Sequence, residues 1–288
     1  MSEVSILSHT RCHLGEGPFY CPRRDTLYWF DILEKRRYAH AFKTGLETFI
    51  YLPEMASAMA SVDETYDLIF TETGLWLHEI GTGCWTPQVY IEPDDETTRS
   101  NDARVHPSGA MWLGTMAKNE APEQGAIYHY RDGAVSLLWN KISIPNAICF
   151  SPDGKTGFWT DTMTARLMRV DVDPLTGLPQ GEATVFYDHT GQDGGLDGAV
   201  TDAHGDIWNA RWGAACVDRY DGTGKRLQTI TMPTAQPTCP AFIGNGRLAV
   251  TSAWKGMDDS QKATDSHAGK TFIIDAGVDA KFEPRVKR

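Results

Sequence analysis

A short segment rich in aromatic and β-branched residues occurs six times in this chain, and no other feature constrains the fold as strongly. The copies read TLYWFD, DLIFTE, AMWLGT, TGFWTD, DIWNAR and RLAVTS, and they begin at residues 26, 67, 110, 156, 206 and 247. Their separations of 41 to 50 residues match the length of a four-stranded propeller blade. The sequence therefore predicts an all-β, six-bladed β-propeller with four-stranded blades around a central channel, forming a single domain over residues 1–288.

Turn-forming residues precede each copy, as in HPSG, SPDG, DAHG and IGNG. Gly, Asn, Asp and Pro supply the backbone angles that a hairpin needs, so each copy is expected to be the second strand of a blade. Helical periodicity with capping residues is nearly absent, which argues against an α/β fold. The N-terminal VSILSHT and the C-terminal TFIIDAG are expected to share one blade.

The segment before each turn is expected to be the first strand of the blade, which lines the channel of a propeller. The leading residues of these six segments are Glu16, Ser57, Asn101, Asn146, Asp197 and Thr238. All six are expected to converge at one mouth of the channel. The turn preference of Asn and Asp explains one such residue, but it does not explain two carboxylates and two carboxamides at one repeat position.

Carboxylate and carboxamide oxygens suit a hard or borderline divalent ion such as Ca²⁺, Mg²⁺ or Mn²⁺. Because such sites accept several ions, Zn²⁺ and Fe²⁺ also stay open as identities. Three protein ligands would leave positions for water and substrate, as a catalytic metal requires. The alternative is a calcium ion that only makes the channel rigid.

Composition limits the class of partner. The formal charge is −11 and the basic residues are scattered, which argues against nucleic acid and against a polybasic membrane patch. There is no signal-peptide pattern at the start and no run of eighteen apolar residues, so we expect a cytoplasmic protein without membrane spans. The six cysteines show no zinc-site spacing and are expected to be reduced and mostly buried. The oligomeric state stays open.

Several longer stretches carry a family resemblance. They read LGEGP (14–18), RSNDARVHPSGAMWLGTM (99–116), IPNAICFSPDGKTGFWTDT (144–162) and DGGLDGAVTDAHGDIWNARWG (193–213). In this order they resemble the senescence-marker-protein/gluconolactonase family, which includes regucalcin and the bacterial sugar lactonases. The resemblance implies a hydrolase that opens a sugar lactone to the sugar acid with one divalent metal ion.

The same resemblance implies roles for particular residues. Glu16, Asn146 and Asp197 match the family's metal ligands, and Asp197 also matches the residue proposed as general base. Arg99 and Asn101 match the pair that contacts the substrate.

One loop departs from the family pattern. After GTM the chain reads Ala117-Lys118-Asn119-Glu120, where the animal regucalcins carry two acidic residues at the positions of Lys118 and Asn119. The loop is expected to reach over the substrate hydroxyls, which makes Asn119 and Glu120 candidate substrate-binding residues. Lys118 would suit a lactone with an additional negative charge. Arg211 and Lys255 are reserve candidates for contact with a substrate carboxylate.

Two alternative functions belong to other classes of protein. One is a non-catalytic propeller that binds calcium or a protein partner, because fold alone does not determine function. The other is a broader metal-dependent esterase or organophosphate hydrolase. No G-x-S-x-G motif is present, which argues against a serine nucleophile.

The remaining aromatic and histidine residues are assigned by position. His106 and His204 are expected in turns, and His13 near the entrance of the site. Trp212 and Trp254 are candidates for packing against a sugar face. The other indoles of interest fall in second strands and are expected in the core: Trp29, Trp112, Trp159 and Trp208.

Overall fold

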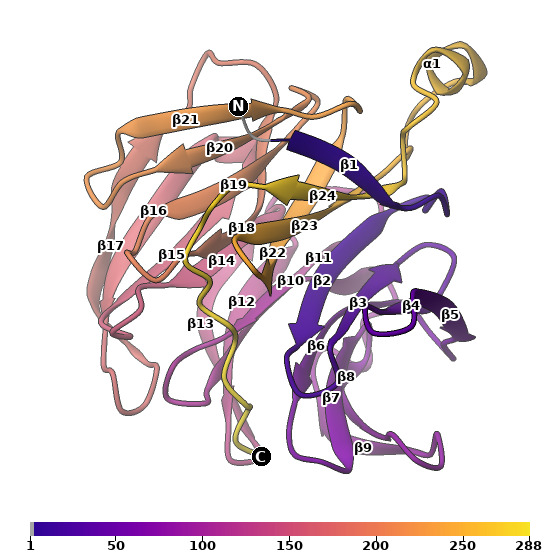
Figure 1. The fold of residues 1–288 in the computed structure, drawn as a ribbon. Helices are drawn as coiled ribbons and strands as arrows, with labels where there is room; N and C mark the ends of the chain where they lie inside the picture. The colour runs from indigo at the N-terminus through magenta and orange to yellow at the C-terminus, as the bar shows by residue number, and fades with distance from the viewer. Residues whose placement is uncertain (1–2) are drawn as a thin grey trace. The chain divides into compact units, whose positions relative to one another are not determined.

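The computed structural model describes residues 3–288, which form six four-stranded antiparallel sheets (Figure 1). The fold is a six-bladed β-propeller with four-stranded blades, as the repeats predict. Each of five blades uses four consecutive strands, and the sixth combines the first described strand with the last three. The described residues divide into two compact units, which are considered separately below. The single domain over residues 1–288 stays a prediction.

Unit 1 comprises the chain up to Pro53 together with Gly191–Phe282, and it contains three blades. Blade I has β2 (Gly15–Cys21), β3 (Thr26–Asp31), β4 (Arg36–Ala41) and β5 (Leu46–Tyr51). Blade V has β18 (Gly195–Thr201), β19 (Ile207–Trp212), β20 (Cys216–Tyr220) and β21 (Arg226–Thr231). Blade VI has β22 (Pro237–Gly244), β23 (Arg247–Ser252), β24 (Thr271–Asp275) and β1 (Glu3–Ser8).

Unit 2 comprises Glu54–Thr190 and Glu283–Arg288, and it contains the other three blades. Blade II has β6 (Ala56–Ser61), β7 (Tyr66–Thr71), β8 (Gly74–Glu79) and β9 (Trp85–Tyr90). Blade III has β10 (Thr98–Val105), β11 (Met111–Ala117), β12 (Gly125–Arg131) and β13 (Ala134–Ile142). Blade IV has β14 (Pro145–Phe150), β15 (Thr156–Asp161), β16 (Arg166–Val172) and β17 (Pro179–Asp188), with a 3₁₀ turn at Thr162–Thr164.

Blade VI joins the first and the last strand of the described chain, because β1 pairs antiparallel with β24 (Figure 1). The register places Val4 opposite Ile274 and Ile6 opposite Phe272. Val4 and Ile6 pack against a buried cluster that includes Trp208 and Phe272. The expected pairing of the two terminal segments is confirmed.

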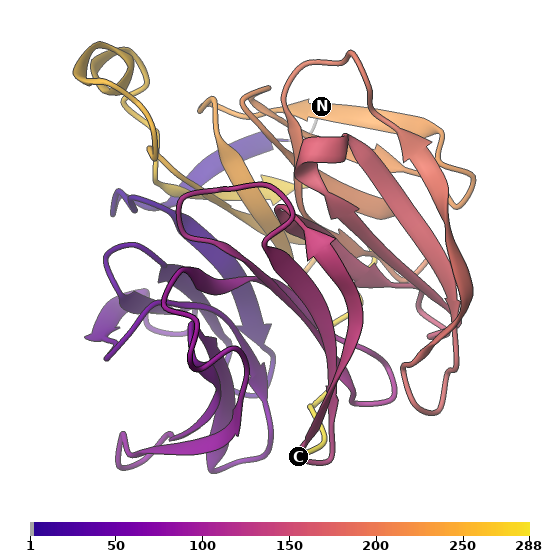
Figure 2. The same cartoon turned by 180° about the vertical axis from the view of Figure 1, so that it is seen from behind.

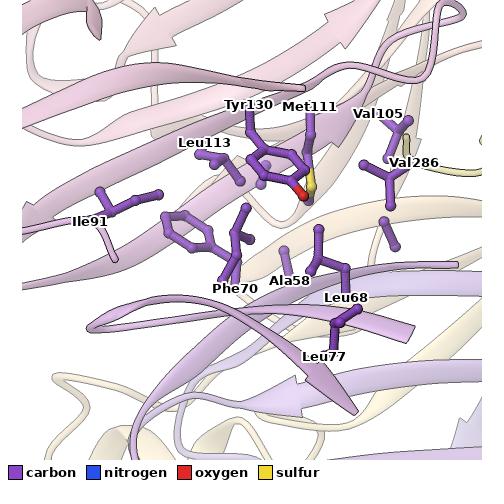
Figure 3. Packing of buried hydrophobic residues seen from close by; sticks show 13 residues of the cluster. Ala58, Leu68, Phe70, Leu77, Ile91, Val105, Met111, Leu113, Tyr130 and Val286 are labelled. Carbon is purple, nitrogen blue, oxygen red and sulfur yellow. The ribbon is translucent and has the colours of Figure 1, made fainter. Parts of the chain in front are cut away.

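In unit 2 the core lies between the sheets of neighbouring blades. Figure 3 shows Phe70 of blade II close to Leu113 and Tyr130 of blade III. Val286, from the last residues of the chain, packs beside Val105 at the edge of this cluster. The C-terminal segment therefore contributes to the core of unit 2 without forming a strand.

The four tryptophans expected in the core are buried, since Trp29, Trp112 and Trp208 have no exposed surface and Trp159 has 7%. All six cysteines are in the thiol form, and four of them are buried. One short helix, α1 (Asp259–Thr264), lies in the excursion between β23 and β24 and extends away from the sheets of unit 1 (Figure 2). Within residues 3–288, no helix has the length and apolar character to span a bilayer.

Candidate metal and substrate site

A β-bulge interrupts the first strand of every blade at or beside its leading residue. Unit 1 has register shifts at Glu16/Phe19, Leu196/Ala199 and Pro237/Pro240. Unit 2 has them at Ala56/Ala58, Ser100/Ala103 and Asn146/Cys149. A bulge places an extra residue in one strand and redirects its side chain. The same local feature, a bulge, therefore redirects the side chain at or beside the leading position in all six blades.

In unit 2, three of the predicted site residues form a continuous hydrogen-bonded chain. Arg99 Nη1 donates to Asn101 Oδ1 at 2.9 Å, and Asn101 Nδ2 donates to Asn146 Oδ1 at 3.0 Å. Asn146 Nδ2 in turn donates to Thr162 Oγ1 at 2.9 Å. Arg99, Asn101 and Asn146 are 3%, 8% and 6% exposed. The structure thus links the predicted substrate pair to one predicted metal ligand, with Asn101 in direct contact with Asn146.

In unit 1, Glu16 and Asp197 are the leading residues of the first strands β2 and β18. Glu16 is partly buried, and its Oε2 accepts a hydrogen bond from Gly17 N at 3.0 Å. Asp197 is 5% exposed. Asn209 Nδ2 donates to the carbonyl oxygens of Asp197 at 2.7 Å and Gly198 at 3.2 Å, which satisfies the main chain of the bulge. We did not predict this role for Asn209, although it is a polar residue in the interior of a buried second strand.

The start of β22 packs against both strands that carry these carboxylates. Thr238 Oγ1 donates to Gly15 O at 2.6 Å, one residue before Glu16. On the other side, a Cβ built on Gly198 would lie 2.4 Å from Cys239 Sγ, so this glycine permits the close approach of β18 to β22. Blade VI therefore anchors the neighbours of both candidate ligands.

Three of the four leading residues that can donate, Ser57, Asn101 and Thr238, connect neighbouring first strands, whereas Asn146 donates to Thr162. Ser57 Oγ donates to Asn101 O at 2.5 Å, and Asn101 Nδ2 donates to Pro145 O at 2.9 Å. Thr238 does the same toward Gly15. Glu16 and Asp197 carry carboxyl groups at this position, and a carboxylate can only accept hydrogen bonds, so in that form neither fills this bridging role.

The donor chemistry fits a hard or borderline divalent ion. Two carboxylates and one carboxamide offer oxygen atoms alone, which is the ligand type preferred by Ca²⁺, Mg²⁺ and Mn²⁺. No group of three His, Cys, Asp or Glu side chains suited to a metal occurs among the described residues. Glu16 and Asp197 belong to unit 1 and Asn146 to unit 2, so their convergence stays a prediction of the repeat.

The comparison with protein-family models gives a match over residues 14–254 to the model described as the SMP-30/Gluconolactonase/LRE-like region. This stretch covers most of the chain, including Glu16, Arg99, Asn101, Asn119, Glu120, Asn146 and Asp197. The chain belongs to the SMP-30/gluconolactonase/LRE-like family.

Similar proteins agree with this membership. A protein of Rhizobium meliloti, provisionally named as a sugar lactone lactonase, is 44% identical over 96% of this chain and 95% of its own. L-arabinolactonase of Azospirillum brasilense is 34% identical over 94% of this chain and 91% of its own. A crystal structure described as a calcium-binding protein, regucalcin, from Agrobacterium tumefaciens has 46% identity and a TM-score of 0.96, covering 98% of this chain and 96% of that one.

In this member of the SMP-30/gluconolactonase/LRE-like family, the distinctive lysine of the 117–120 loop is paired. Lys118 Nζ lies 2.5 Å from Glu72 Oε2 and donates to Glu96 O at 2.8 Å. Asn119 Oδ1 accepts from Ala121 N at 3.1 Å, and Glu120 adopts a positive φ of 61°. Glu72 therefore neutralises the charge that the sequence suggested for an acidic substrate.

Arg211, a reserve candidate for a substrate charge, is held inside unit 1. Its Nη1 lies 2.8 Å from Asp218 Oδ2, and its Nη2 donates to Asp193 O. The residue is 2% exposed. Arg211 thus has a structural ion pair, and the other reserve candidate, Lys255, is partly buried beyond the end of β23.

His13, three residues before Glu16, contacts Trp254, which follows β23. Their rings stack with centroids 3.8 Å apart and an interplanar angle of 2°, and Lys262 Nζ lies 4.4 Å from the Trp254 ring centroid. These contacts occupy the indole surface that we considered for a sugar. Trp212 is partly buried at the end of β19.

The two other histidines occupy turns, as expected. His106 is fully buried, with Nδ1 2.8 Å from Ser108 Oγ and Nε2 2.8 Å from Gly154 O. His204 is exposed and lies 3.1 Å from Asp279. Neither histidine belongs to the hydrogen-bonded chain that contains Arg99.

Proposed function

We propose that this chain is a metal-dependent sugar lactonase that hydrolyses an aldono- or aldaro-lactone to the open-chain acid. The observation that carries the proposal is the buried chain from Arg99 through Asn101 to Asn146. It couples a cation and an amide suited to polyol hydroxyls with an oxygen ligand suited to a metal. The names of two relatives, a sugar lactone lactonase and an L-arabinolactonase, support the reaction class.

We propose Glu16, Asn146 and Asp197 as the residues that hold the ion. A divalent ion there would polarise the lactone carbonyl and lower the pKa of a water molecule. The oxygen-only donor set supports Ca²⁺, Mg²⁺ or Mn²⁺, and Zn²⁺ and Fe²⁺ stay within the range to be tested.

The proposed roles of the side chains follow from their chemistry. Asp197 removes a proton from the attacking water as the bond from water oxygen to carbonyl carbon forms. When the bond from that carbon to the ring oxygen breaks, Asp197 returns the proton to the leaving oxygen. General acid–base catalysis of this kind contributes on the order of 10²–10⁴-fold in rate. Arg99 and Asn101 hold the sugar hydroxyls so that the carbonyl faces the water.

Substrate selection is assigned to the 117–120 loop, with Asn119 and Glu120 as the proposed contacts to hydroxyl groups. Both lie at a turn that follows β11, on the same strand pair as Arg99, since Arg99 is paired with Met116 in the sheet. A site built from amides, carboxylates and a guanidinium favours a polyol over a bulky apolar ester.

The proposal is tested with chelator-treated protein and a panel of aldono- and aldaro-lactones, with each divalent ion restored separately. We expect metal-dependent ring opening above the spontaneous rate, and loss of turnover in Asp197→Asn. The matched control is Asp279→Asn, whose carboxylate is exposed beside His204.

The outcomes separate the alternatives. Metal binding without opening of any lactone would indicate a calcium-binding or partner-binding propeller instead. Faster hydrolysis of apolar esters or organophosphates than of lactones would indicate the broader hydrolase.

A further inference from the structure

The side chain of Asp31 holds the main chain immediately before Glu16. Its Oδ2 accepts from His13 N at 2.7 Å, and its Oδ1 accepts from Leu14 N at 3.2 Å. A third N–H, from Glu34, also donates to Oδ1 at 3.3 Å. Asp31 is 1% exposed and is the last residue of β3.

Asp161 repeats this arrangement in unit 2, immediately before Asn146. Its Oδ2 accepts from Ser143 N at 2.8 Å, and its Oδ1 accepts from Ile144 N at 3.1 Å. Met163 N supplies the third bond at 3.2 Å. Asp161 is 6% exposed and is the last residue of β15.

The two aspartates therefore bind the same two positions relative to the candidate ligands. In each case the N–H groups come from the third and second residues before the ligand. The residue just before the ligand is the sheet partner of the aspartate, namely Gly15 for Asp31 and Pro145 for Asp161.

The residues directly after the two ligands also have the same backbone conformation. Gly17 and Ala147, which follow Glu16 and Asn146, have φ values of 53° and 52°. A left-handed conformation is unfavourable for alanine and persists only where surrounding contacts enforce it. The strand is thus fixed on both sides of Asn146, and the glycine after Glu16 allows the same conformation without strain.

The other four blades have a different residue at the end of the second-strand repeat: Glu72, Thr115, Arg211 and Ser252. Of these, Glu72 makes one comparable bond, because its Oε1 accepts from Met55 N at 3.1 Å. Aspartate therefore occurs at this position only in the two blades whose leading residues are Glu16 and Asn146.

We propose that Asp31 and Asp161 are positioning residues for the metal site, each fixing the main chain so that Glu16 or Asn146 presents its oxygen to the ion. The inference rests on the proposed function, because it requires the predicted metal ligands. Each carboxylate accepts one of the two N–H groups before the ligand on each of its oxygens, which fixes the orientation of two consecutive peptide planes. Partners that orient a ligand in this way typically change metal affinity by about 10- to 100-fold when they are replaced.

The test measures Mn²⁺ affinity of the chelator-treated, full-length protein by calorimetric titration. Asp31→Asn and Asp161→Asn each turn one accepting oxygen into an NH₂ group that faces an N–H. We expect Mn²⁺ to bind about 10- to 100-fold more weakly in each variant. Saturating Mn²⁺ should restore most of the turnover, because neither residue takes part in the chemistry. Asp31→Glu keeps the charge and, as Glu72 shows, can retain one main-chain bond, so it should fall between the wild type and Asp31→Asn.

The matched control is Asp202→Asn. Asp202 is fully buried, and its Oδ1 accepts from His204 N at 2.9 Å and Asp206 N at 3.0 Å in a turn that precedes β19. It is expected to lose thermal stability while keeping wild-type Mn²⁺ affinity. Equal weakening of Mn²⁺ binding in Asp202→Asn would overturn the proposal. Wild-type affinity in folded Asp31→Asn and Asp161→Asn would also overturn it, and so would the absence of Mn²⁺ binding by the wild type.

If the protein is not a lactonase, these experiments give a different result. In that case the wild type binds Mn²⁺ but opens no lactone, while the affinity ratios among the variants still decide the positioning role.

Discussion

Asn101 Nδ2 donates a hydrogen bond to Asn146 Oδ1 at 3.0 Å, across two neighbouring first strands. The same Asn101 accepts from Arg99 through Oδ1, so its amide links a cation to a candidate metal ligand. The oxygen of the amide accepts from Arg99, and its nitrogen donates both to Asn146 and to the carbonyl of Pro145. The relation predicts that substrate binding and metal binding depend on one another.

Replacement of Asn101 by alanine should therefore reduce both functions. Three buried hydrogen bonds disappear, to Arg99, Pro145 O and Asn146, and one of them comes from a charged group. Such a loss corresponds to about a 10- to 100-fold decrease in kcat/KM. Steady-state kinetics on an accepted lactone would measure this decrease. Ser57→Ala is the control, because it removes only a bond to the carbonyl of Asn101. An equal effect in both variants would contradict the assigned role of the Asn101 side chain.

Gly198→Ala should destabilise the protein and disturb Asp197. The added methyl group would lie 2.4 Å from Cys239 Sγ and 2.5 Å from its Cβ, so β18 and β22 must separate. Overpacking of this kind costs about 1–3 kcal/mol. Urea unfolding would measure the change. Gly222→Ala is the matched control, because nothing lies within 4 Å of its added Cβ, and it should leave the free energy of unfolding nearly unchanged.

Glu72→Gln should change substrate preference by removing the partner charge of Lys118. The pair is 2.5 Å apart in the wild type, and the new carboxamide would still accept from Met55 N while leaving the ammonium without a carboxylate. We expect the ratio of kcat/KM for an aldarolactone to that for an aldonolactone to rise about tenfold, which corresponds to about 1.4 kcal/mol. The double variant Glu72→Gln/Lys118→Gln should return the ratio to its wild-type value. An unchanged ratio in the single variant would exclude Lys118 from substrate selection.

The buried carboxyl of Asp102 should make stability depend on pH. Burial raises the pKa of Asp102 to about 6 from an ordinary value of 3.8, although Arg104 at 3.7 Å acts in the opposite direction. The folded state therefore binds this proton more tightly than the unfolded state. The resulting stabilisation is complete below pH 3.8 and is lost as the pH rises through 6.

Between pH 5 and 7 this group should lower the free energy of unfolding by about 1 kcal/mol. Urea unfolding at pH 5, 6 and 7 would measure the slope, which should become flatter in Asp102→Asn. Asp132→Asn, at an exposed carboxylate, should retain the wild-type slope. If Asp102→Asn also kept that slope, another group would be responsible.

Much of the fold could be predicted because residues close together in the sequence mark each copy of the repeat. Three of the six second-strand copies coincide with β3, β15 and β23 to the residue, since turn residues bound them on one side and the strand ends with a polar residue on the other. The leading residues of the first strands were found by alignment of these copies. The bulges that redirect them were not predicted, because a bulge depends on pairing between strands.

The contacts that modify the candidate site were harder to find. Glu72 and Lys118 lie in different blades, and Arg211 meets Asp218 on the adjacent strand, so neither ion pair has a local sequence signal. The helix α1 has a readable capping box at Asp258 and Gln261, but it is too short for periodicity to reveal it. Glu283, which contacts Arg104 at 2.5 Å, belongs to a C-terminal segment with no regular structure and hence no pattern.

The pairing of β1 with β24 also has a consequence for synthesis. During translation β1 emerges first, and its partner follows about 265 residues later, so at 5–20 residues per second it waits roughly 13–50 s for the strand it needs. Its half-buried side chains Val4 and Ile6 stay without their native neighbours throughout that time. Blade VI, which contains the first of the described strands, therefore cannot close until β24 has left the ribosome.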